Sequence, residues 1–495
     1  MGKIVNWVKN NKVEFAILVA IIAIGAFLRL YKIDEYMTFL GDEGRDVIVV
    51  SRFLKYFDIM LVGPGTSIGN MYLGPLYYYM MALPLLIANF SPVGPAVMVT
   101  LLGIATIILV WWVGREWFLP KAALIAATLY AISPTIIVYS RSSWNPNVMP
   151  FFSLLSIYSI WRVWKNKEFK WLIVLGISFA FVLQSHYLGL LLLPTLGLFW
   201  YFTKNKSQEF KKKLLITSII FILLMSPLII FDARHGWRNF IAMGQFFSVK
   251  KDAVTFKPWF FVSKIWPIYK MSITSLVAAK INLLGITTSI GLASYMIWSV
   301  IKKKNLLLVS WFSFGILGLS VYKGQVYDHY FGFIFPAIFL LIGALIYELS
   351  QIKKQQKLFS ICLYVYLAVL VLVNLWNTPI RKAPNMQLPR SIMISRFIEE
   401  KANGERFNIA TISKNSNRDV YQYFLLLWGA KVVDTDPSAV VYTVTDQLFV
   451  VCEMPKEKCD PTHDPSAWIT NFGWTKIVDR WEVWGTNVYK LGHTD

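Results

Sequence analysis

The sequence predicts an all-α polytopic bundle of about 11–13 membrane-spanning helices, followed by a small α/β domain outside the cytoplasm. Hydrophobic residues make up 56% of the 495 residues, more than a soluble globular protein usually contains. Many apolar runs approach the roughly 17–25 residues that cross a bilayer as a helix. From about residue 380 these runs give way to short alternating patterns. We therefore expect a transmembrane domain at residues 1–379 and a second domain at residues 380–495.

Twelve apolar segments make up the predicted bundle. They lie at residues 13–31, 76–90, 94–113, 121–139, 145–164, 171–187, 188–202, 214–231, 281–301, 306–322, 327–347 and 358–376. Basic clusters orient them, because lysine and arginine concentrate in cytoplasmic loops. The clusters are Lys3, Lys9 and Lys12; Arg162, Lys165, Lys167 and Lys170; Lys204, Lys206 and Lys211–Lys213; Lys302–Lys304; and Lys353, Lys354 and Lys357. The N-terminus is therefore expected in the cytoplasm, and the C-terminal domain outside it.

One early segment does not fit as a full crossing. Four crossings between residues 13 and 139 would leave the Ser140–Pro146 turn in the cytoplasm, whereas the later basic loops require it outside. Pro84 and Pro134 interrupt two of the segments, and proline breaks helices. We expect one of the three segments between residues 76 and 139 to be short, re-entrant or half-spanning.

Two connections outside the membrane have recognisable character. Residues 46–58 place apolar side chains at near-helical spacing, which predicts an amphipathic helix lying in the membrane interface. Turns are expected at Gly63–Thr66 and at Gly69–Asn70. Residues 232–280 are long and rich in aromatic side chains, and we expect a loop that lies on the membrane and moves as a lid.

The C-terminal domain is expected to mix strands and helices. The predicted strands are 407–413, 439–444, 447–452 and 481–491, and the predicted helices are 390–401 and 418–428. Cys452 and Cys459 lie seven residues apart in this domain. Outside the cytoplasm they form either a disulfide or two separate thiols.

Charge is distributed unevenly between the two domains. The net charge of +21 belongs to residues 1–379, which hold 35 basic and 14 acidic residues, because the remainder holds 14 of each. This excess fits cytoplasmic loops and contacts with anionic lipid headgroups or phosphates. Nucleic acid is not an expected partner, because the basic residues are interleaved with membrane spans.

An acidic cluster follows the first apolar segment. Six of the 14 acidic residues of the membrane part fall within 25 residues; they are Asp34, Glu35, Asp42, Glu43, Asp46 and Asp58. The densest stretch is Phe39–Asp46. Either it is a solvated loop that caps a helix, or it holds a catalytic base that faces a lipid-linked substrate.

These features together resemble a known superfamily. The acidic loop after the first span, the amphipathic segment and the stretch Gly74-Pro-Leu-Tyr-Tyr-Tyr79 are similar to those of the GT-C superfamily of polyprenyl-phosphate-sugar-dependent glycosyltransferases. Within it, the chain looks most like the protein O-mannosyltransferase and lipid A aminoarabinose transferase group. The stretches Ser133–Pro146, Gln184–Pro194 and Asp328–Pro336 also fit. The resemblance covers roughly residues 10–350, and the tail matches no named pattern.

The resemblance implies a cell-membrane enzyme. It would move a sugar from a polyprenyl-phosphate to a hydroxyl of a protein, lipid or glycan at the extracytoplasmic face, with inversion. The first acidic residue of the opening loop, Asp42, would be the general base. Glu43 would position the acceptor or assist a metal, and Asp46 is a reserve candidate. A divalent metal is compatible with the group, but the sequence identifies no set of ligands for one.

A transferring enzyme also needs fixed positive charge at the leaving phosphate. Candidates at the predicted outer ends of spans are Arg141, His329, Lys323 and Arg45, of which the first two fit the family pattern best. For Arg141 the alternative is an arginine that snorkels to the interface. His186 and Tyr187 lie in a polar patch at a hairpin tip and are candidates for substrate binding or for a structural role.

Two other functions remain open. A transporter or flippase for lipid-linked glycans would explain the many spans, but it predicts repeated halves and charges near mid-span, and the sequence has neither. A ligase or polymerase would use a polyprenyl diphosphate donor in place of the monophosphate.

Overall fold

The computed structural model describes residues 2–66, 71–203, 207–248, 254–351, 357–436 and 438–494. The turn expected at Gly69–Asn70 and the basic residues Lys204, Lys206, Lys353 and Lys354 lie outside these ranges. The chain divides into two compact units. The helical unit comprises Met1–Tyr31, Ile59–Met81 and Pro95–Ala383, and the α/β unit comprises Lys32–Asp58, Ala82–Gly94 and Pro384–Asp495. The acidic first loop therefore belongs to the same compact unit as the C-terminal residues.

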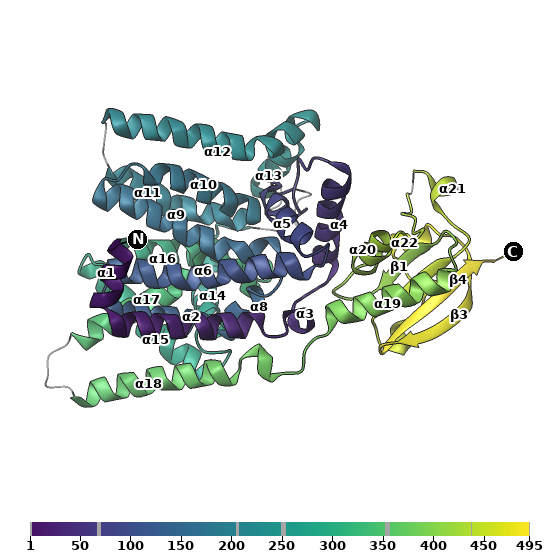
Figure 1. Ribbon diagram of the computed structural model, residues 1–495. Coiled ribbons are helices and arrows are strands. Elements are labelled where there is room, and N and C mark those ends of the chain that lie inside the picture. Colours follow the sequence, from purple (N-terminus) through teal and green to yellow (C-terminus); the bar gives the residue numbers. More distant parts are fainter. Residues whose placement is uncertain are drawn as a thin grey trace. The chain divides into compact units, whose positions relative to one another are not determined.

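The helical unit is a bundle of apolar helices. They are α1 (Gly2–Asn10), α2 (Lys12–Leu30), α7 (Pro120–Ile132), α8 (Pro134–Tyr139), α9 (Met149–Asn166), α10 (Trp171–Ser185), α11 (Leu193–Thr203), α12 (Gln208–Arg234), α13 (Arg238–Ser248), α14 (Pro258–Leu276), α15 (Asn282–Ile301), α16 (Leu306–Ser320), α17 (Phe335–Ser350) and α18 (Lys357–Trp376). Short 3₁₀ turns precede three of them: η1 (Asn145–Val148), η2 (Tyr187–Leu192) and η3 (Asp328–Ile334). Helix α10 packs between α9 and α12 (Figure 1).

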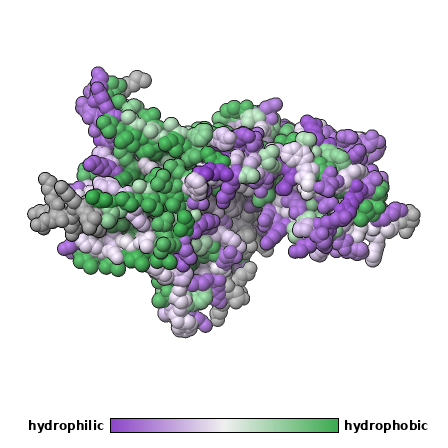
Figure 2. All heavy atoms as spheres, turned by 90° about the horizontal axis from the view of Figure 1, so that it is seen from below, coloured by the Kyte–Doolittle hydropathy of each residue, from purple (hydrophilic) through white to green (hydrophobic). Residues whose placement is uncertain are grey.

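The spans confirm the predicted fold class. Among the residues that the structure describes, five helices are long and apolar enough to cross a membrane; they lie at Lys12–Leu30, Val93–Trp117, Gln208–Arg234, Asn282–Ile301 and Asp328–Ser350. The same part of the chain holds six shorter apolar helices. Helix α17 is apolar and buried on all sides from Phe335 to Ala344, as expected for a central helix. In contrast, α12 exposes Leu215, Ile222 and Leu223. Figure 2 shows hydrophobic side chains over much of the helical unit, which is the surface that lipid requires.

Two of the three early segments are short or interrupted, whereas the topology argument required only one. Helix α5 (Leu76–Ile87) has only 12 residues and contains Pro84. It is about 18 Å long, well short of the ~30 Å hydrocarbon core. The apolar segment at residues 121–139 divides at Ser133 into α7 and α8, because Pro134 starts a new helix. Helix α6 (Val93–Trp117), with 25 residues, is long enough for a full crossing.

The expectation of a long loop at residues 232–280 is wrong for the part that the structure describes. Helix α12 continues to Arg234, and α13 and α14 fill most of the remainder. Asp232 caps α13, since its two carboxylate oxygens accept the backbone N–H groups of Asn239 and Phe240. Helix α14 begins with Pro258 at its first position, a residue that favours helix starts. Most of the aromatic side chains in the described part of this segment therefore lie on helices, with Trp237 and Phe256 as exceptions.

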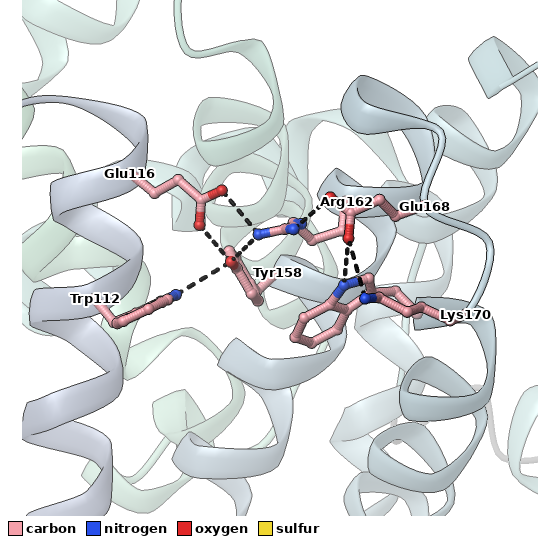
Figure 3. A network of polar contacts seen from close by, with 7 residues as sticks. Trp112, Glu116, Tyr158, Arg162, Glu168 and Lys170 are labelled. Atoms are coloured by element: carbon pink, nitrogen blue, oxygen red, sulfur yellow. Dashed lines mark hydrogen bonds and ion pairs between the residues drawn. The ribbon is translucent and has the colours of Figure 1, made fainter. Parts of the chain in front are cut away.

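A polar network joins three helices at the end of the bundle that carries the cluster of basic residues around Arg162 (Figure 3). The hydroxyl of Tyr158 on α9 donates to Glu116 on α6 and accepts from Trp112 Nε1. Arg162 forms ion pairs with Glu116 and with Glu168, which precedes α10. Part of the positive charge on which the expected cytoplasmic location of this loop rests is therefore balanced within the protein.

The α/β unit contains a four-stranded sheet in the order β1-β2-β4-β3. Its strands are β1 (Asn408–Ile412), β2 (Leu448–Cys452), β3 (Thr475–Val483) and β4 (Thr486–His493), and its helices include α3 (Ile33–Tyr36), α4 (Gly41–Tyr56), α19 (Gln387–Ala402) and α20 (Asp419–Trp428). Strand β1 runs parallel to β2, and β4 runs antiparallel to both of its neighbours. The surface of this unit is mainly hydrophilic in Figure 2.

Sequence patterns located most of these elements, but two of the expected strands are wrong. The strand expected at 439–444 is wrong, because Val440–Thr443 form one helical turn, α21. Local hydrogen bonds start that turn: Asp436 Oδ1 accepts from the N–H of Ser438 at 2.8 Å. The single strand expected at 481–491 is a hairpin. Trp484 and Gly485 both have positive φ angles, as a two-residue hairpin turn requires.

Cys452 and Cys459 form a disulfide in this unit. Replacing them as Cys452→Ala and Cys459→Ser should lower the free energy of unfolding by about 2–3 kcal/mol, because the bond restricts a short loop in the unfolded chain. Chemical unfolding followed by tryptophan fluorescence would measure the change. Cys362→Ser, which removes the free thiol, is the control and should leave the midpoint unchanged. A reductant that leaves the wild-type midpoint in place would contradict the expectation.

Candidate active site

The acidic cluster forms the start of helix α4. This helix begins at Gly41, five residues earlier than the periodicity of the sequence indicated, so Asp42 and Glu43 lie in its first turn. Acidic residues stabilise a helix N-terminus through the helix dipole. The side chain of Glu43 also turns back, and its Oε2 accepts the N–H of Leu40 at 3.0 Å. For Glu43, the helix-capping alternative proposed for the acidic cluster therefore applies.

The three carboxylates of this turn differ in accessibility. The side chain of Asp42 is 49% exposed, whereas that of Asp46 is 0% exposed and Glu43 is buried. Arg45 lies between Asp42 and Asp46. Its Nη1 is 2.9 Å from Asp42 Oδ1, and its Nη2 is 2.7 Å from Asp46 Oδ1. Asp42 is thus the one of these three side chains that a dissolved or lipid-bound substrate reaches most easily, and Arg45 fixes its orientation.

Burial raises the pKa of Glu43 to about 7, although hydrogen bonds from the backbone of Leu40 and of Glu43 itself oppose the shift. The nearby charges of Asp42 and Asp46 raise it further. Because the native state then holds this proton more tightly than the unfolded chain does, stability is highest below the ordinary pKa of 4.5 and decreases as pH rises to about 7.

Glu43→Gln should remove this pH dependence. Glutamine retains an oxygen that accepts the N–H of Leu40, and it cannot ionise. The expected gain at pH 8 is on the order of 3 kcal/mol at most. Thermal midpoints measured in detergent at pH 4.5, 6 and 8 would test it. The wild-type protein should lose more stability across this range than the variant, and parallel curves for the two proteins would refute the shift.

In the helical unit, three of the stretches that fit the resemblance meet around His329. The ring centroid of His329, on η3, lies 4.7 Å from that of Trp144, 6.2 Å from that of Tyr139 and 6.5 Å from that of His186. Ser133–Pro146, Gln184–Pro194 and Asp328–Pro336 are far apart in the chain. Their convergence makes them one candidate site.

His186 is held as a neutral hydrogen-bonding group. Burial lowers its pKa to about 4, and the charge of His329 lowers it further. Its Nδ1 accepts the N–H of Leu188 at 3.1 Å, so the neutral ring carries its proton on Nε2. The hydroxyl of Tyr187 donates to the carbonyl of Tyr72 at 2.5 Å. Tyr187 therefore anchors the 59–81 segment, whereas His186 offers a donor.

Arg141 lies inside the protein, where its side chain is only 1% exposed. Its Nη2 donates to the carbonyl oxygen of Tyr31 at 2.7 Å. This burial by protein argues against a simple snorkelling role. The adjoining turn is also fixed, because Asn145 Nδ2 donates to the carbonyl of Ser185 at 2.6 Å.

Arg29 is a second buried arginine beside this turn, and sequence reasoning did not select it. Its side chain is 0% exposed, and its Nε donates to Ser140 Oγ at 2.8 Å. It also donates to the carbonyl oxygens of Gly25 and Ala131. The available signal was its position, because a charged residue near the end of an apolar segment usually has a function or a specific partner.

The remaining predicted cations lie at the surface. Lys323 is exposed, and its carbonyl oxygen accepts from Lys264 Nζ at 3.2 Å. Asp328, next to His329, forms an ion pair with Lys280 at 2.8 Å.

A narrow crevice beside His329 is lined in part by Thr106, Tyr139, Ser140 and Asn147. Within the described ranges, no group of three His, Cys, Asp or Glu side chains is arranged to hold a metal ion.

The predicted site residues thus fall into two groups. Asp42, Glu43, Arg45 and Asp46 belong to the α/β unit, and Arg141, His186, Tyr187, Lys323 and His329 belong to the helical unit. In the first group Arg45 joins Asp42 and Asp46, and in the second the rings of His186 and His329 lie 6.5 Å apart. The first supplies an accessible carboxylate, and the second supplies buried and surface cations with polar rings.

Comparison with known proteins agrees with these features. Residues 73–231 match the sequence model of the family described as dolichyl-phosphate-mannose-protein mannosyltransferase. No curated protein matches the sequence. Among solved structures, ArnT from Cupriavidus metallidurans bound to undecaprenyl phosphate is similar at a TM-score of 0.62 and 12% identity, over 96% of this chain and 97% of that chain.

A second similar structure is the archaeal oligosaccharyltransferase AglB from Archaeoglobus fulgidus, in complex with an inhibitory peptide and a dolichol-phosphate. It has a TM-score of 0.56 and 13% identity, over 90% of this chain and 70% of that chain. At such identities the likeness concerns the fold. The described residues include helices suited to a multi-pass membrane protein. The fold is similar to that of ArnT and of AglB, and residues 73–231 match the mannosyltransferase family model, in agreement with the resemblance found in the sequence.

Proposed function

We propose that this protein transfers a sugar from a polyprenyl-phosphate donor to a hydroxyl acceptor at the extracytoplasmic face of the cell membrane, with inversion. The observation that carries the proposal is the convergence of three family-like stretches on His329, of which two lie within the matched residues 73–231. The similar structures contain undecaprenyl phosphate and dolichol-phosphate, which supports a lipid-linked donor. The acceptor is a protein, lipid or glycan hydroxyl.

In the proposed reaction, Asp42 takes the proton of the acceptor hydroxyl. The acceptor oxygen then forms a bond to the anomeric carbon while the bond from that carbon to the phosphate oxygen breaks, and polyprenyl phosphate leaves with the electron pair. Attack from the face opposite the phosphate inverts the anomeric centre. Asp42 suits this role because it is the most exposed of the three carboxylates in its turn. Glu43 supports the turn through its cap.

The developing charge on the phosphate needs cations. We assign Arg141 and His329 to the donor phosphate, with Lys323 as an outer contact, and His186 to a hydrogen bond from its Nε2 to the substrate. Arg45 is less suited to the phosphate, because its guanidinium already pairs with Asp42 and Asp46. Its proposed task is to orient Asp42, and Asp46 completes that pairing.

Purified full-length protein incubated with labelled polyprenyl-phosphate sugars and membrane-derived acceptors would test the function. Transfer of label, release of polyprenyl phosphate and an inverted anomeric configuration by NMR are expected. Assays with a polyprenyl diphosphate donor test the ligase or polymerase alternative. Proteoliposomes that report movement of the intact lipid-linked sugar across the membrane test the transporter or flippase alternative. Transport without cleavage, or transfer from the diphosphate donor alone, would overturn the proposal.

A further inference from the structure

Arg29, near the end of α2, is a wholly buried charge that the proposed reaction does not use. Its Nε donates to Ser140 Oγ at 2.8 Å, and its Nη1 donates to the carbonyl oxygens of Gly25 at 2.9 Å and Ala131 at 2.8 Å. Its Nη2 lies 3.5 Å from the carbonyl oxygen of Tyr130. Every acceptor that the described residues present to this guanidinium is therefore a neutral oxygen.

A second arginine ties the same helix to a neighbour, and it has a carboxylate partner. Arg115 on α6 forms an ion pair with Glu14 on α2 at 2.8 Å, and its side chain is 33% exposed. Arginine is rarely buried in full unless it is paired, because a charge that leaves water loses its hydration. Arg115 follows this rule. Arg29 is buried more deeply, yet no carboxylate of the described residues pairs with it.

The unbalanced charge lies beside the residues that we assign to the donor phosphate. Ser140, the partner of Arg29, directly precedes Arg141 and lines the crevice beside His329. The hydroxyl of Ser140 donates to the carbonyl oxygen of Ile136 at 2.6 Å, so its oxygen is left to accept from Arg29. The charge is thus one hydrogen bond from a side chain that lines the crevice, and charges interact strongly in such a buried setting.

Arg141 makes a return contact to the same end of α2. Its Nη2 donates to the carbonyl oxygen of Tyr31, two residues after Arg29. The two arginines therefore join the end of α2 and the Ser140–Arg141 turn in both directions. An anion bound at this turn would offset both positive charges.

We propose that Arg29 is a positioning residue of the donor-phosphate site: it holds the Ser140–Arg141 turn, and the phosphate of the lipid donor balances its charge. This inference rests on the proposed function, in which Arg141 and His329 bind that phosphate. When the bond to the anomeric carbon breaks, a singly charged phosphodiester becomes a monoester that carries up to two negative charges. A fixed positive charge therefore stabilises the leaving phosphate more than it stabilises the bound donor.

The kinetic test compares Arg29→Gln with Arg115→Gln in the full-length protein. Both variants remove a guanidinium that ties α2 to its neighbours, but only Arg29→Gln removes the charge beside the crevice. In Arg29→Gln, kcat should decrease about tenfold or more, whereas KM for the donor should rise only about two- to threefold. Arg115→Gln should lower the thermal midpoint but leave kcat and KM within about twofold of wild type. An active Arg29→Gln variant with a normal kcat would overturn the inference and leave the proposed function intact.

Binding measured without transfer separates the inference from the proposed function. Undecaprenyl phosphate should raise the thermal midpoint of the wild type, whereas the uncharged alcohol undecaprenol should not. The Kd for undecaprenyl phosphate should rise about tenfold in Arg29→Gln and stay unchanged in Arg115→Gln. If the wild type transfers no sugar from any donor, the proposed function fails, and this arm still decides whether Arg29 serves an anion. Equal stabilisation of the wild type by the phosphate and by the alcohol, or an equal Kd in Arg29→Gln, would refute the role.

Helix α4 provides an internal reference, because its start is held within the α/β unit. A Cβ atom added at Gly44 would lie 2.6 Å from the backbone nitrogen of Val420, closer than real Cβ atoms approach backbone. The N–H of Phe39 also donates to Gln387 Oε1 at 2.9 Å. Amide hydrogen exchange in α4 should therefore stay unchanged in Arg29→Gln.

Arg29→Lys covers the case in which Arg29→Gln does not fold or exchanges faster in α4 as well. Lysine retains the positive charge but loses the fork of donors that binds Ser140 and two carbonyl oxygens. The stabilisation by undecaprenyl phosphate should therefore persist in Arg29→Lys, at more than half of its wild-type size. Loss of that stabilisation in a folded Arg29→Lys protein would show that the charge is not what the phosphate balances, and would overturn the inference.

Discussion

Replacing Asp42 with asparagine is expected to slow sugar transfer by about 10²–10⁴-fold, the usual contribution of a general base. Asparagine has the same size and retains an oxygen that accepts a hydrogen bond from Arg45, so the first turn of α4 should persist. It cannot take a proton from the acceptor hydroxyl. The rate measured with saturating labelled donor should therefore collapse while KM for the donor changes little, because Asp42 acts on the acceptor.

Asp58→Asn is the matched control for this variant. Asp58 follows the same helix, is 57% exposed and pairs with Arg52, so the substitution removes an equal charge from the same segment. It should leave the rate within about twofold of wild type, since a surface ion pair contributes little. An Asp42→Asn protein that folds and transfers sugar at a near-normal rate would remove Asp42 from the mechanism and direct attention to Glu43, whose pKa of about 7 also suits a base.

Arg141→Gln is expected to lower kcat/KM for the donor by about 10²–10³-fold, as loss of a preorganised partner for a developing negative charge does elsewhere. Arg141→Lys retains the charge but loses the planar fork of donors, so an intermediate loss is expected. The measurement is a donor titration with each variant in the same detergent. If Arg141 contacts the phosphate, kcat/KM should decrease in the order wild type, Arg141→Lys, Arg141→Gln.

Folding must be separated from binding for this buried residue. Thermal midpoints report the structural cost, which both Arg141 variants share because both alter the hydrogen bond to the carbonyl of Tyr31. Arg52→Gln, at a side chain that is 63% exposed, is the control and should leave both midpoint and kcat/KM unchanged. Equal activity in Arg141→Gln and wild type would show that this arginine does not contact the donor phosphate and that its role is structural, through the hydrogen bond to Tyr31.

The sequence predicted what local patterns determine. Apolar length located the spans, amphipathic spacing located α4, and alternation located β1 and β2. It failed where the deciding interaction is specific to a few atoms. Asp232 caps α13, so a segment that was expected to be a loop is a helix. Trp484 and Gly485 have positive φ angles, so a segment that was expected to be one strand is a hairpin.

The site was predictable only in part, for a similar reason. Residue type and position near span ends selected Arg141, His186 and His329, and the structure brings these stretches together. Composition gave no indication that Arg29 would bind Ser140, because that contact joins residues 111 positions apart. Nor does any local pattern pair Gly44 with Val420, since only the folded chain places a backbone nitrogen where a Cβ would otherwise lie.

The contact between Gly44 and Val420 also bears on how the protein is made. A ribosome adds about 5–20 residues per second, so the roughly 375 residues between these positions need about 20–75 s to be synthesised. During that interval the acidic turn is already complete in sequence but lacks the surface on which it rests. The accessible carboxylate therefore reaches its final surroundings only after α20 has been synthesised, and a chain interrupted before α20 would lack them.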